Sequence, residues 1–134
     1  MPEKSHIILY IDDDTDDLQM LQDAVQSVDK NFHLIEATTG MQGLSWLNKM
    51  KLAGQLPCLI VLDINMPGMN GRETFRHIKS DDVLTAIPVV IFSTSSNEKD
   101  RSFFQGDNVE YIMKPVNFSY LVKVAQRLLN YCRN

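Results

Sequence analysis

The chain has 134 residues, a net charge of −4 and 44% hydrophobic residues, which is an ordinary composition for one globular domain with a core of its own. This acidic balance excludes the basic surface of a nucleic-acid-binding protein, so we expect no nucleic-acid partner. No apolar run approaches the roughly 18 residues of a transmembrane helix, and the N-terminal MPEKSH lacks a signal-peptide core. We therefore expect a cytoplasmic protein that has no membrane partner.

The two cysteines of the chain, Cys58 and Cys132, lie far apart in the sequence. Neither belongs to a Cys-x-x-Cys motif or to a cluster of cysteine and histidine residues. This spacing predicts two unpaired thiols in a reducing compartment.

Short apolar runs alternate along the chain with segments of helical period. The first half predicts a strand at 7–11, a helix with Leu18, Leu21, Val25 and Val28 on its apolar face, a strand at 32–37, and a helix that Thr39 caps and that ends near residue 53. The second half predicts a strand at 58–62, a helix at about 71–80, a strand at 89–93, a helix at about 97–105 that Ser95, Ser96 or Asn97 caps, a strand at 109–113, and a C-terminal helix. The segment 80–88 should be a surface connection with one helical turn.

Five successive strand–helix units predict an α/β fold in which a doubly wound, five-stranded parallel sheet carries helices on both faces. The third, fourth and fifth strands are apolar almost throughout, as strands covered on both faces should be. The last helix shows a full amphipathic stripe, which should bury Phe118, Leu121, Val122, Ala125, Leu128, Leu129 and Cys132.

Polar side chains follow four of the five predicted strands. In such sheets ligands bind beyond the carboxyl ends of the strands, so these residues should meet at one edge. They are Asp12, Asp13 and Asp14 after the first strand, Asp63 after the third, Ser93 and Thr94 at the end of the fourth, and Lys114 with Pro115 after the fifth.

Carboxylates that lie close together repel one another unless a cation neutralises them. Oxygen ligands favour a hard ion, so we expect Mg²⁺, or Mn²⁺ in its place. Lys114 would add a positive charge suited to a phosphate group. A carboxylate can itself accept a phosphoryl group, and Asp63 is the best candidate because it stands alone at its strand end. An isolated acid at such a position would otherwise be a turn residue, and the flanking Asp14, Asp16 and Asp17 should favour the start of the first helix electrostatically.

Four separated motifs resemble the receiver domain of bacterial two-component response regulators. They are ILYIDD at 8–13, LIVLDINMPGMNG at 59–71, PVVIFSTS at 88–95 and YIMKP at 111–115. The chemotaxis member of this family has the flavodoxin-like strand order 2-1-3-4-5, so the resemblance implies that order here. The segment GRETF at 71–75 is most similar to the stand-alone receivers related to the phytochrome-associated regulators.

The resemblance implies a role for each of these residues. Asp63 would be the phosphoacceptor, and the acidic pair Asp12 and Asp13 would bind Mg²⁺ together with Asp63 and the backbone carbonyl of Asn65. Ser93 and Lys114 match the family's hydroxyl and lysine, and Thr94 adjoins the hydroxyl. Tyr111 falls on the aromatic switch position, and the bond from Lys114 to Pro115 would be cis.

The implied function is a phosphorylation-controlled switch whose phosphoryl donor is a sensor histidine kinase or a phosphotransfer protein. Phosphorylation would change the face formed by the fourth helix, the fifth strand and the fifth helix, toward an unknown downstream protein or a second copy of the chain. Gly106-Asp107 replaces the family's usual Gly-Ala and predicts a short fourth helix. The chain, 1–134, is expected to be a single receiver domain without an output domain and not a dedicated enzyme.

Two other functions compete with this prediction. A phosphatase of the haloacid dehalogenase type also uses an aspartyl nucleophile, but its nucleophile strand comes first and carries a second Asp where this chain has Asn65. A receiver-like interaction module would never accept phosphate, and such modules commonly lack the acceptor or the lysine. The chain retains both Asp63 and Lys114.

Overall fold

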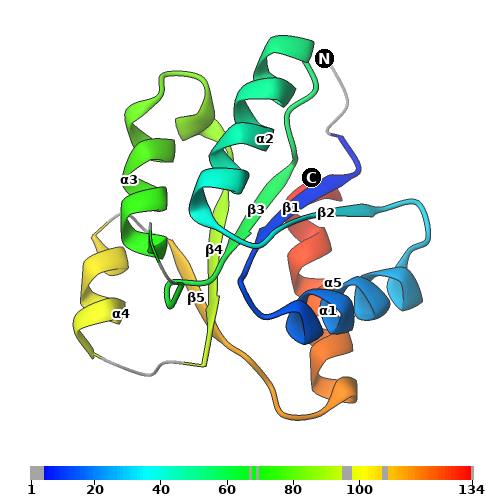
Figure 1. Cartoon of the computed structure of the whole chain (residues 1–134). Coiled ribbons are helices and arrows are strands. Elements are labelled where there is room, and N and C mark those ends of the chain that lie inside the picture. The colour runs from blue at the N-terminus through cyan, green and yellow to red at the C-terminus, as the bar shows by residue number, and fades with distance from the viewer. Residues whose placement is uncertain (1–4, 67, 69, 95–97, 107–108, 134) are drawn as a thin grey trace.

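The computed structural model describes residues 5–66, 68, 70–94, 98–106 and 109–133. Within these residues, five parallel strands form one sheet in the order β2-β1-β3-β4-β5 (Figure 1). The strands are β1 (Ile7–Ile11), β2 (His33–Ala37), β3 (Leu59–Leu62), β4 (Val89–Ser93) and β5 (Glu110–Met113). The predicted fold class and strand order are therefore confirmed.

Helices cover both faces of this sheet (Figure 1). They are α1 (Thr15–Val28), α2 (Gly40–Ala53), α3 (Gly71–Ser80), the short 3-10 helix η1 (Leu84–Ala86), α4 (Glu98–Gln105) and α5 (Phe118–Arg133). Helices α1 and α5 lie on one face, and α2, α3 and α4 lie on the other, because buried residues of each group share one core cluster. Each described helix is too short or too polar to cross a membrane.

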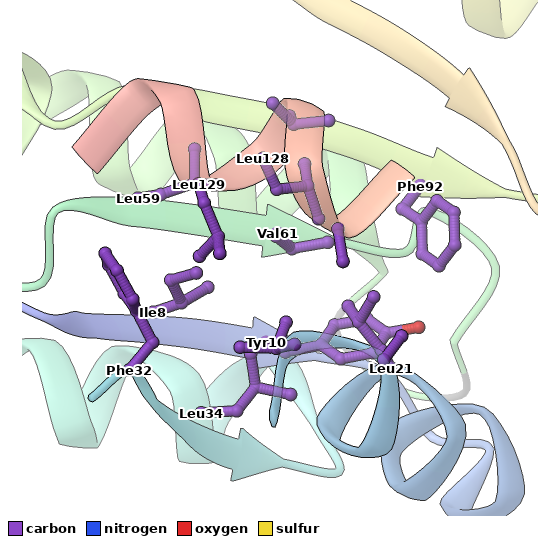
Figure 2. Packing of buried hydrophobic residues seen from close by; sticks show 14 of the residues in the cluster. Ile8, Tyr10, Leu21, Phe32, Leu34, Leu59, Val61, Phe92, Leu128 and Leu129 are labelled. Carbon is purple, nitrogen blue, oxygen red and sulfur yellow. The ribbon is translucent and has the colours of Figure 1, made fainter. Parts of the chain in front are cut away.

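The core on the α1–α5 face holds side chains from β1, β3 and β4 and from both helices (Figure 2). Strand residues at alternate positions point to the same face, so Ile8 and Tyr10 enter this core while Leu9 and Ile11 enter the opposite one. The all-apolar run of β3 follows from burial on both faces. This double burial fixes the ends of the central strands, where the polar residues lie.

Local signals in the sequence predicted most element ends. Thr39 caps α2 by accepting a hydrogen bond from the Gln42 N–H, and the expected helical turn in 80–88 is η1. Helix α4 is short, as expected, with 8 residues. The proposed caps at 95–97 lie outside the described residues. The expectation for Phe118 was wrong: it is 44% exposed, because it occupies the first position of α5, where the helix has only begun to cover the sheet.

The expectation of two free thiols was also wrong, because Cys58 and Cys132 form a disulfide. Cys58 lies directly before β3 and Cys132 lies in the last turn of α5, and their Cα atoms are 5.2 Å apart. The two residues are separated by 74 positions, so local spacing gave no signal of the pairing. Packing of α5 along the sheet brings them together in the core of the α1–α5 face.

Backbone hydrogen bonds continue the parallel pairing one residue beyond three strands. The Asp12 N–H donates to Ala37, the Asp63 N–H to Ile11, and the Lys114 N–H to Ser93, each over 2.9 Å. Asp12, Asp63 and Lys114 are therefore fixed at the same edge of the sheet, at its carboxyl end.

Candidate functional site

Asp63 directly follows β3 and begins the loop that leads to α3. Its carboxylate is held by the Asn65 N–H, which donates to Oδ1 over 3.1 Å. The loop folds back tightly, because the Gly71 N–H donates to the Ile64 carbonyl over 3.2 Å. A Cβ at Gly71 would lie 2.3 Å from Ile64 Cα and 2.6 Å from the Asp63 carbonyl oxygen. Glycine is therefore required where α3 begins against the backbone of Asp63.

The Asp63 side chain is only slightly exposed, and this burial disfavours its charged form. Burial raises the pKa of Asp63 to about 6; the positive charge of Lys114 opposes this shift and the negative charge of Asp12 adds to it. A carboxylate with this pKa is largely ionised at neutral pH and can act as a nucleophile.

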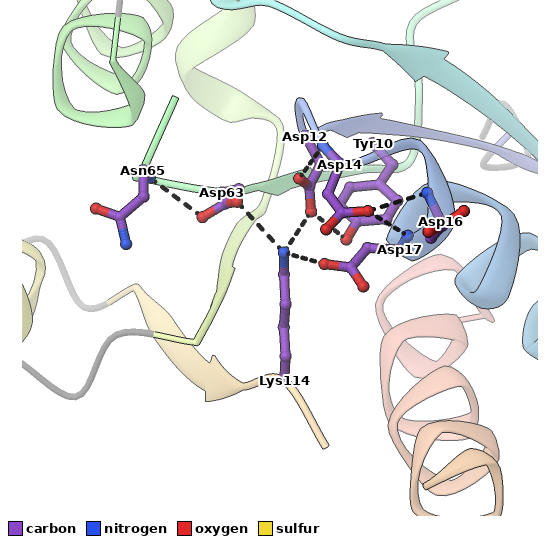
Figure 3. A network of polar contacts seen from close by, with 8 residues as sticks. All are labelled: Tyr10, Asp12, Asp14, Asp16, Asp17, Asp63, Asn65 and Lys114. Atoms are coloured by element: carbon purple, nitrogen blue, oxygen red, sulfur yellow. Dashed lines mark hydrogen bonds and ion pairs between the residues drawn. The ribbon is translucent and has the colours of Figure 1, made fainter. Parts of the chain in front are cut away.

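Asp12 is fully buried and receives three hydrogen bonds from the protein (Figure 3). The Asp14 N–H donates to Oδ1 over 2.9 Å, and the Tyr10 hydroxyl and Lys114 Nζ donate to Oδ2 over 2.6 Å each. Burial, together with the charge of Asp12, raises the pKa of Tyr10 far above its ordinary value, so Tyr10 is a hydrogen-bond donor. Sequence reasoning missed this role of Tyr10, because its position in β1 predicts an ordinary core aromatic.

Lys114 reaches three carboxylates from the end of β5 (Figure 3). Its Nζ lies 2.6 Å from Asp12, 2.7 Å from Asp17 and 3.3 Å from Asp63. Burial would lower the pKa of Lys114, but the hydrogen bonds to Asp12 and Asp17 and the charge of Asp63 raise it above its ordinary value. The side chain is thus a permanent ammonium group whose three N–H bonds can serve three carboxylates.

The acids that begin α1 divide between two roles. Asp14 is the N-cap, whose carboxylate accepts from the N–H groups of Asp16 and Asp17, in agreement with the expectation that it stabilises the helix start. Asp17 differs from expectation, because it also binds Lys114 across the site. Its place one turn into α1 could have suggested this contact, since residues in the first turn of α1 face the same sheet edge.

Three acids gather closely enough to hold a cation. Single carboxylate oxygens of Asp12, Asp13 and Asp63 all lie within 4.8 Å of one another, and Asp13 is exposed. An open pocket of about 470 Å³ adjoins them, lined by Asp13, Asp14, Thr15, Asp17, Asp63, Asn65, Thr94 and Lys114. An all-oxygen donor set of this charge fits a hard divalent ion such as Mg²⁺ or Mn²⁺.

The remaining predicted residues lie around this pocket or behind it. Ser93 is fully buried at the end of β4, whereas the next residue, Thr94, is exposed and lines the pocket. Tyr111 is half-buried on β5, where it packs against the core of the α2–α4 face, and Arg101 of α4 lies 5.0 Å from its ring centre. Tyr111 thus connects β5 to α4.

The expected cis bond between Lys114 and Pro115 is wrong, because every peptide bond among the described residues is trans. The trans form is intrinsically preferred before proline, by about 0.5–1 kcal/mol. In this form the Lys114 N–H still pairs with Ser93 and its Nζ still reaches Asp12.

Comparison with known proteins adds independent information. The family model described as "Response regulator receiver domain" matches residues 8–126. Response regulator Rcp1 of Synechocystis is 31% identical over 126 residues, which cover 90% of this chain and 84% of that protein. A probable methanogenesis regulatory protein, FilR2 of Methanothrix harundinacea, is 27% identical over 131 residues, covering 96% and 84% of the two chains.

Solved structures agree with these relatives. The phosphorylated cyanobacterial phytochrome response regulator RcpA superposes with a TM-score of 0.84 at 30% identity, covering 98% of this chain and 94% of that one. The Mn²⁺-bound form of Rcp1 gives a TM-score of 0.81 at 29% identity, covering 99% and 96%. The similarity to phytochrome-associated regulators that GRETF suggested is confirmed. The chain belongs to the receiver domain family of two-component response regulators, which are signalling switches controlled by phosphorylation.

Proposed function

We propose that this receiver domain accepts a phosphoryl group on Asp63 from a histidine kinase or a phosphotransfer protein, in a reaction that needs Mg²⁺ or Mn²⁺. One observation carries the proposal: Asp63 borders an open pocket with Asp13, and the ammonium group of Lys114 lies 3.3 Å from its carboxylate. Phosphoryl transfer depends mainly on positioning and on neutralising charge, and these residues provide both.

In the proposed reaction an Asp63 carboxylate oxygen attacks the phosphorus atom of the donor. The bond from phosphorus to the donor's histidine nitrogen breaks, its electron pair stays on that nitrogen, and an aspartyl-phosphate forms. Lys114 is close enough to Asp63 to contact a phosphoryl oxygen without leaving Asp12. When bound, a divalent cation would supply the positive charge that neutralises the other phosphoryl oxygens.

We assign the cation to Asp13, Asp63 and the backbone carbonyl of Asn65, with Asp12 as the fourth group. Asp13 is the exposed member of the acidic cluster and is accessible from the pocket. Asp12 already accepts hydrogen bonds on both oxygens, so its main contribution would be negative charge at a fixed position.

The proposed response to phosphorylation runs from the pocket to α4, β5 and α5. Ser93 or Thr94 at the end of β4 would donate its hydroxyl to the phosphoryl group, and Tyr111 on β5 would change its packing. Arg101 of α4 lies over the Tyr111 ring, so movement of Tyr111 would be transmitted to α4. This face would then bind a downstream protein or a second copy of the chain.

The single-domain organisation and the cytoplasmic location expected from the sequence belong to this proposal. We also propose that the domain catalyses only phosphotransfer and the slow loss of its own phosphoryl group. Position 65 is Asn, so the second Asp of a dehalogenase-type phosphatase is missing, and that function is not favoured.

Intact mass spectrometry tests the proposal. The purified protein is incubated with Mg²⁺ and a small phosphodonor such as acetyl phosphate, beside the Asp63→Asn variant and a sample with excess chelator. The expected result is one phosphoryl adduct on the unsubstituted protein with Mg²⁺, and none in the other two samples. Absence of the adduct from the unsubstituted protein would refute the switch, and rapid turnover of phosphate esters would instead favour a phosphatase.

A further inference from the structure

Tyr10 carries a hydroxyl group on a side chain that is otherwise part of the hydrophobic core. It is fully buried in the middle of β1, and its ring packs 6.0 Å from that of Phe92 in the core of the α1–α5 face. A phenylalanine would fill the same space and would not require a hydrogen-bond partner. Tyr10 directs its hydroxyl out of this core toward Asp12, two residues later on the same side of the strand (Figure 3).

This hydroxyl shares one oxygen of Asp12 with the site lysine. Tyr10 and Lys114 both donate to Oδ2 over 2.6 Å, while the Asp14 N–H holds Oδ1. The carboxylate is therefore anchored at both ends, and its orientation does not depend on Lys114 alone. Without the Tyr10 hydroxyl, the side chain of Lys114 would be the remaining donor to Oδ2 among the residues that the structure describes.

We propose that Tyr10 is a positioning residue that holds the Asp12 carboxylate for cation binding and keeps Lys114 available to Asp63. The proposal rests on the function proposed above, in which Asp12 belongs to the cation site and Lys114 contacts the phosphoryl group.

The geometry of Lys114 explains the second part of this proposal. Its Nζ is already closer to Asp12 than to Asp63, at 2.6 Å against 3.3 Å. Loss of the Tyr10 hydroxyl leaves Oδ2 less satisfied and strengthens its attraction for Lys114. The Asp12 carboxylate would then be oriented by Lys114 and the Asp14 N–H alone, and the ammonium group would be held more firmly by Asp12 and be less available to Asp63.

The test compares Tyr10→Phe with Tyr131→Phe. Tyr131 also donates its hydroxyl to a carboxylate over 2.6 Å, but that carboxylate is Glu110 on β5, so the control removes the same bond outside the acidic cluster. Mn²⁺ binding is measured by electron paramagnetic resonance of the free ion. We expect Tyr10→Phe to weaken Mn²⁺ binding about tenfold, which is typical for loss of a group that orients a metal ligand, and Tyr131→Phe to leave it within about twofold.

A double-mutant cycle separates positioning from a general effect on folding. If Tyr10 acts through Asp12, Tyr10→Phe should not weaken Mn²⁺ binding further when Asp12→Ala is already present. The proposal would be overturned if Tyr10→Phe lowered the Mn²⁺ affinity by the same factor with and without Asp12→Ala. Phosphorylation by acetyl phosphate should follow the same pattern, with a slower rate in Tyr10→Phe and an unchanged rate in Tyr131→Phe.

A measurement on the unsubstituted protein covers the case in which Tyr10→Phe does not fold. The buried Tyr10 hydroxyl proton, bonded to Asp12, should give a protected downfield proton resonance that shifts when Mg²⁺ is added. A resonance that does not shift when Mg²⁺ is added would overturn the inference about Tyr10 but not the proposed function. The same holds if Tyr10→Phe binds Mn²⁺ as tightly as the unsubstituted protein. If the unsubstituted protein neither binds Mn²⁺ nor accepts phosphate, the proposed function fails as well.

Discussion

At the scale of single residues, Asp63 opposes the stability of the fold. Its charge is retained in a buried position among other acids, and its pKa is raised to about 6 from an ordinary value of 3.8. A raised pKa means that the folded state holds a proton that the unfolded state has already lost. Below about pH 4 the carboxyl is neutral in both states and does not destabilise the fold, and the fold loses stability as the pH rises from about 4 through 6.

Asp63→Asn should therefore stabilise the cation-free protein at neutral pH. A shift of about 2 pKa units corresponds to at most about 3 kcal/mol. Urea unfolding with chelator present, at pH 5 and at pH 8, measures this difference. The variant should gain more at pH 8 than at pH 5, and an equal change at both pH values would show that burial of this charge has no energetic cost.

At the scale of elements, the junction between the loop after β3 and the start of α3 depends on Gly71. Gly71 allows the first residue of α3 to lie against Ile64 and the carbonyl of Asp63, where no side chain fits. The Asn70 side chain accepts from the Glu73 N–H and caps the helix at the same point. The position of the Asp63 carboxylate is thus set from two sides, by β3 before it and by the start of α3 after it.

Gly71→Ala should push α3 away from this loop. We expect a loss of about 1–3 kcal/mol in the free energy of unfolding, as for overpacked sites, and slower phosphorylation of Asp63. Gly106→Ala is the matched control, because a Cβ there would meet no atom within 4 Å. Urea unfolding and the mass-spectrometric assay provide the two measurements; similar behaviour of both variants would show that the close contact at Gly71 has no effect.

The elements that the sequence predicted correctly are those with local signals. Apolar periods and caps such as Thr39 located the helices and strands, and the order of polar residues at strand ends predicted that Asp12, Asp13, Asp63 and Lys114 would meet. Contacts across the fold had no such signal. Asp17 binds Lys114 across a separation of 97 residues, and beyond its place in the first turn of α1 no local pattern indicates this pairing. The Tyr10 contact with Asp12 is local, but the alternation of side chains in β1 predicts only a core aromatic and not a hydroxyl bonded to a carboxylate.

At the scale of the whole molecule, one covalent bond joins distant parts of the chain. The disulfide between Cys58 and Cys132 connects the start of the central strand β3 to the last turn of α5, across a sequence separation of 74. Its formation depends on the packed position of α5, which no local pattern around either cysteine reveals. The bond closes a long loop, and a cross-link of this kind lowers the conformational entropy of the unfolded chain more as the loop becomes longer.

Reduction of this disulfide should lower the free energy of unfolding by up to about 4 kcal/mol, the loop-entropy value for this separation. Urea unfolding with and without a reducing agent measures the effect. The double variant Cys58→Ser and Cys132→Ser provides the control, because its stability should not respond to the reducing agent. Two titratable thiols in the protein unfolded without reductant would contradict the pairing.

The central claim is that one acid among several at this edge of the sheet receives the phosphoryl group. It is tested most directly by phosphorylating the unsubstituted protein with acetyl phosphate and Mg²⁺, reducing the acyl phosphate with borohydride, and locating the resulting homoserine by peptide mass spectrometry. The account predicts homoserine at position 63 and aspartate at positions 12, 13, 14 and 17. Homoserine at any of those four positions, with Asp63 unchanged, would contradict it.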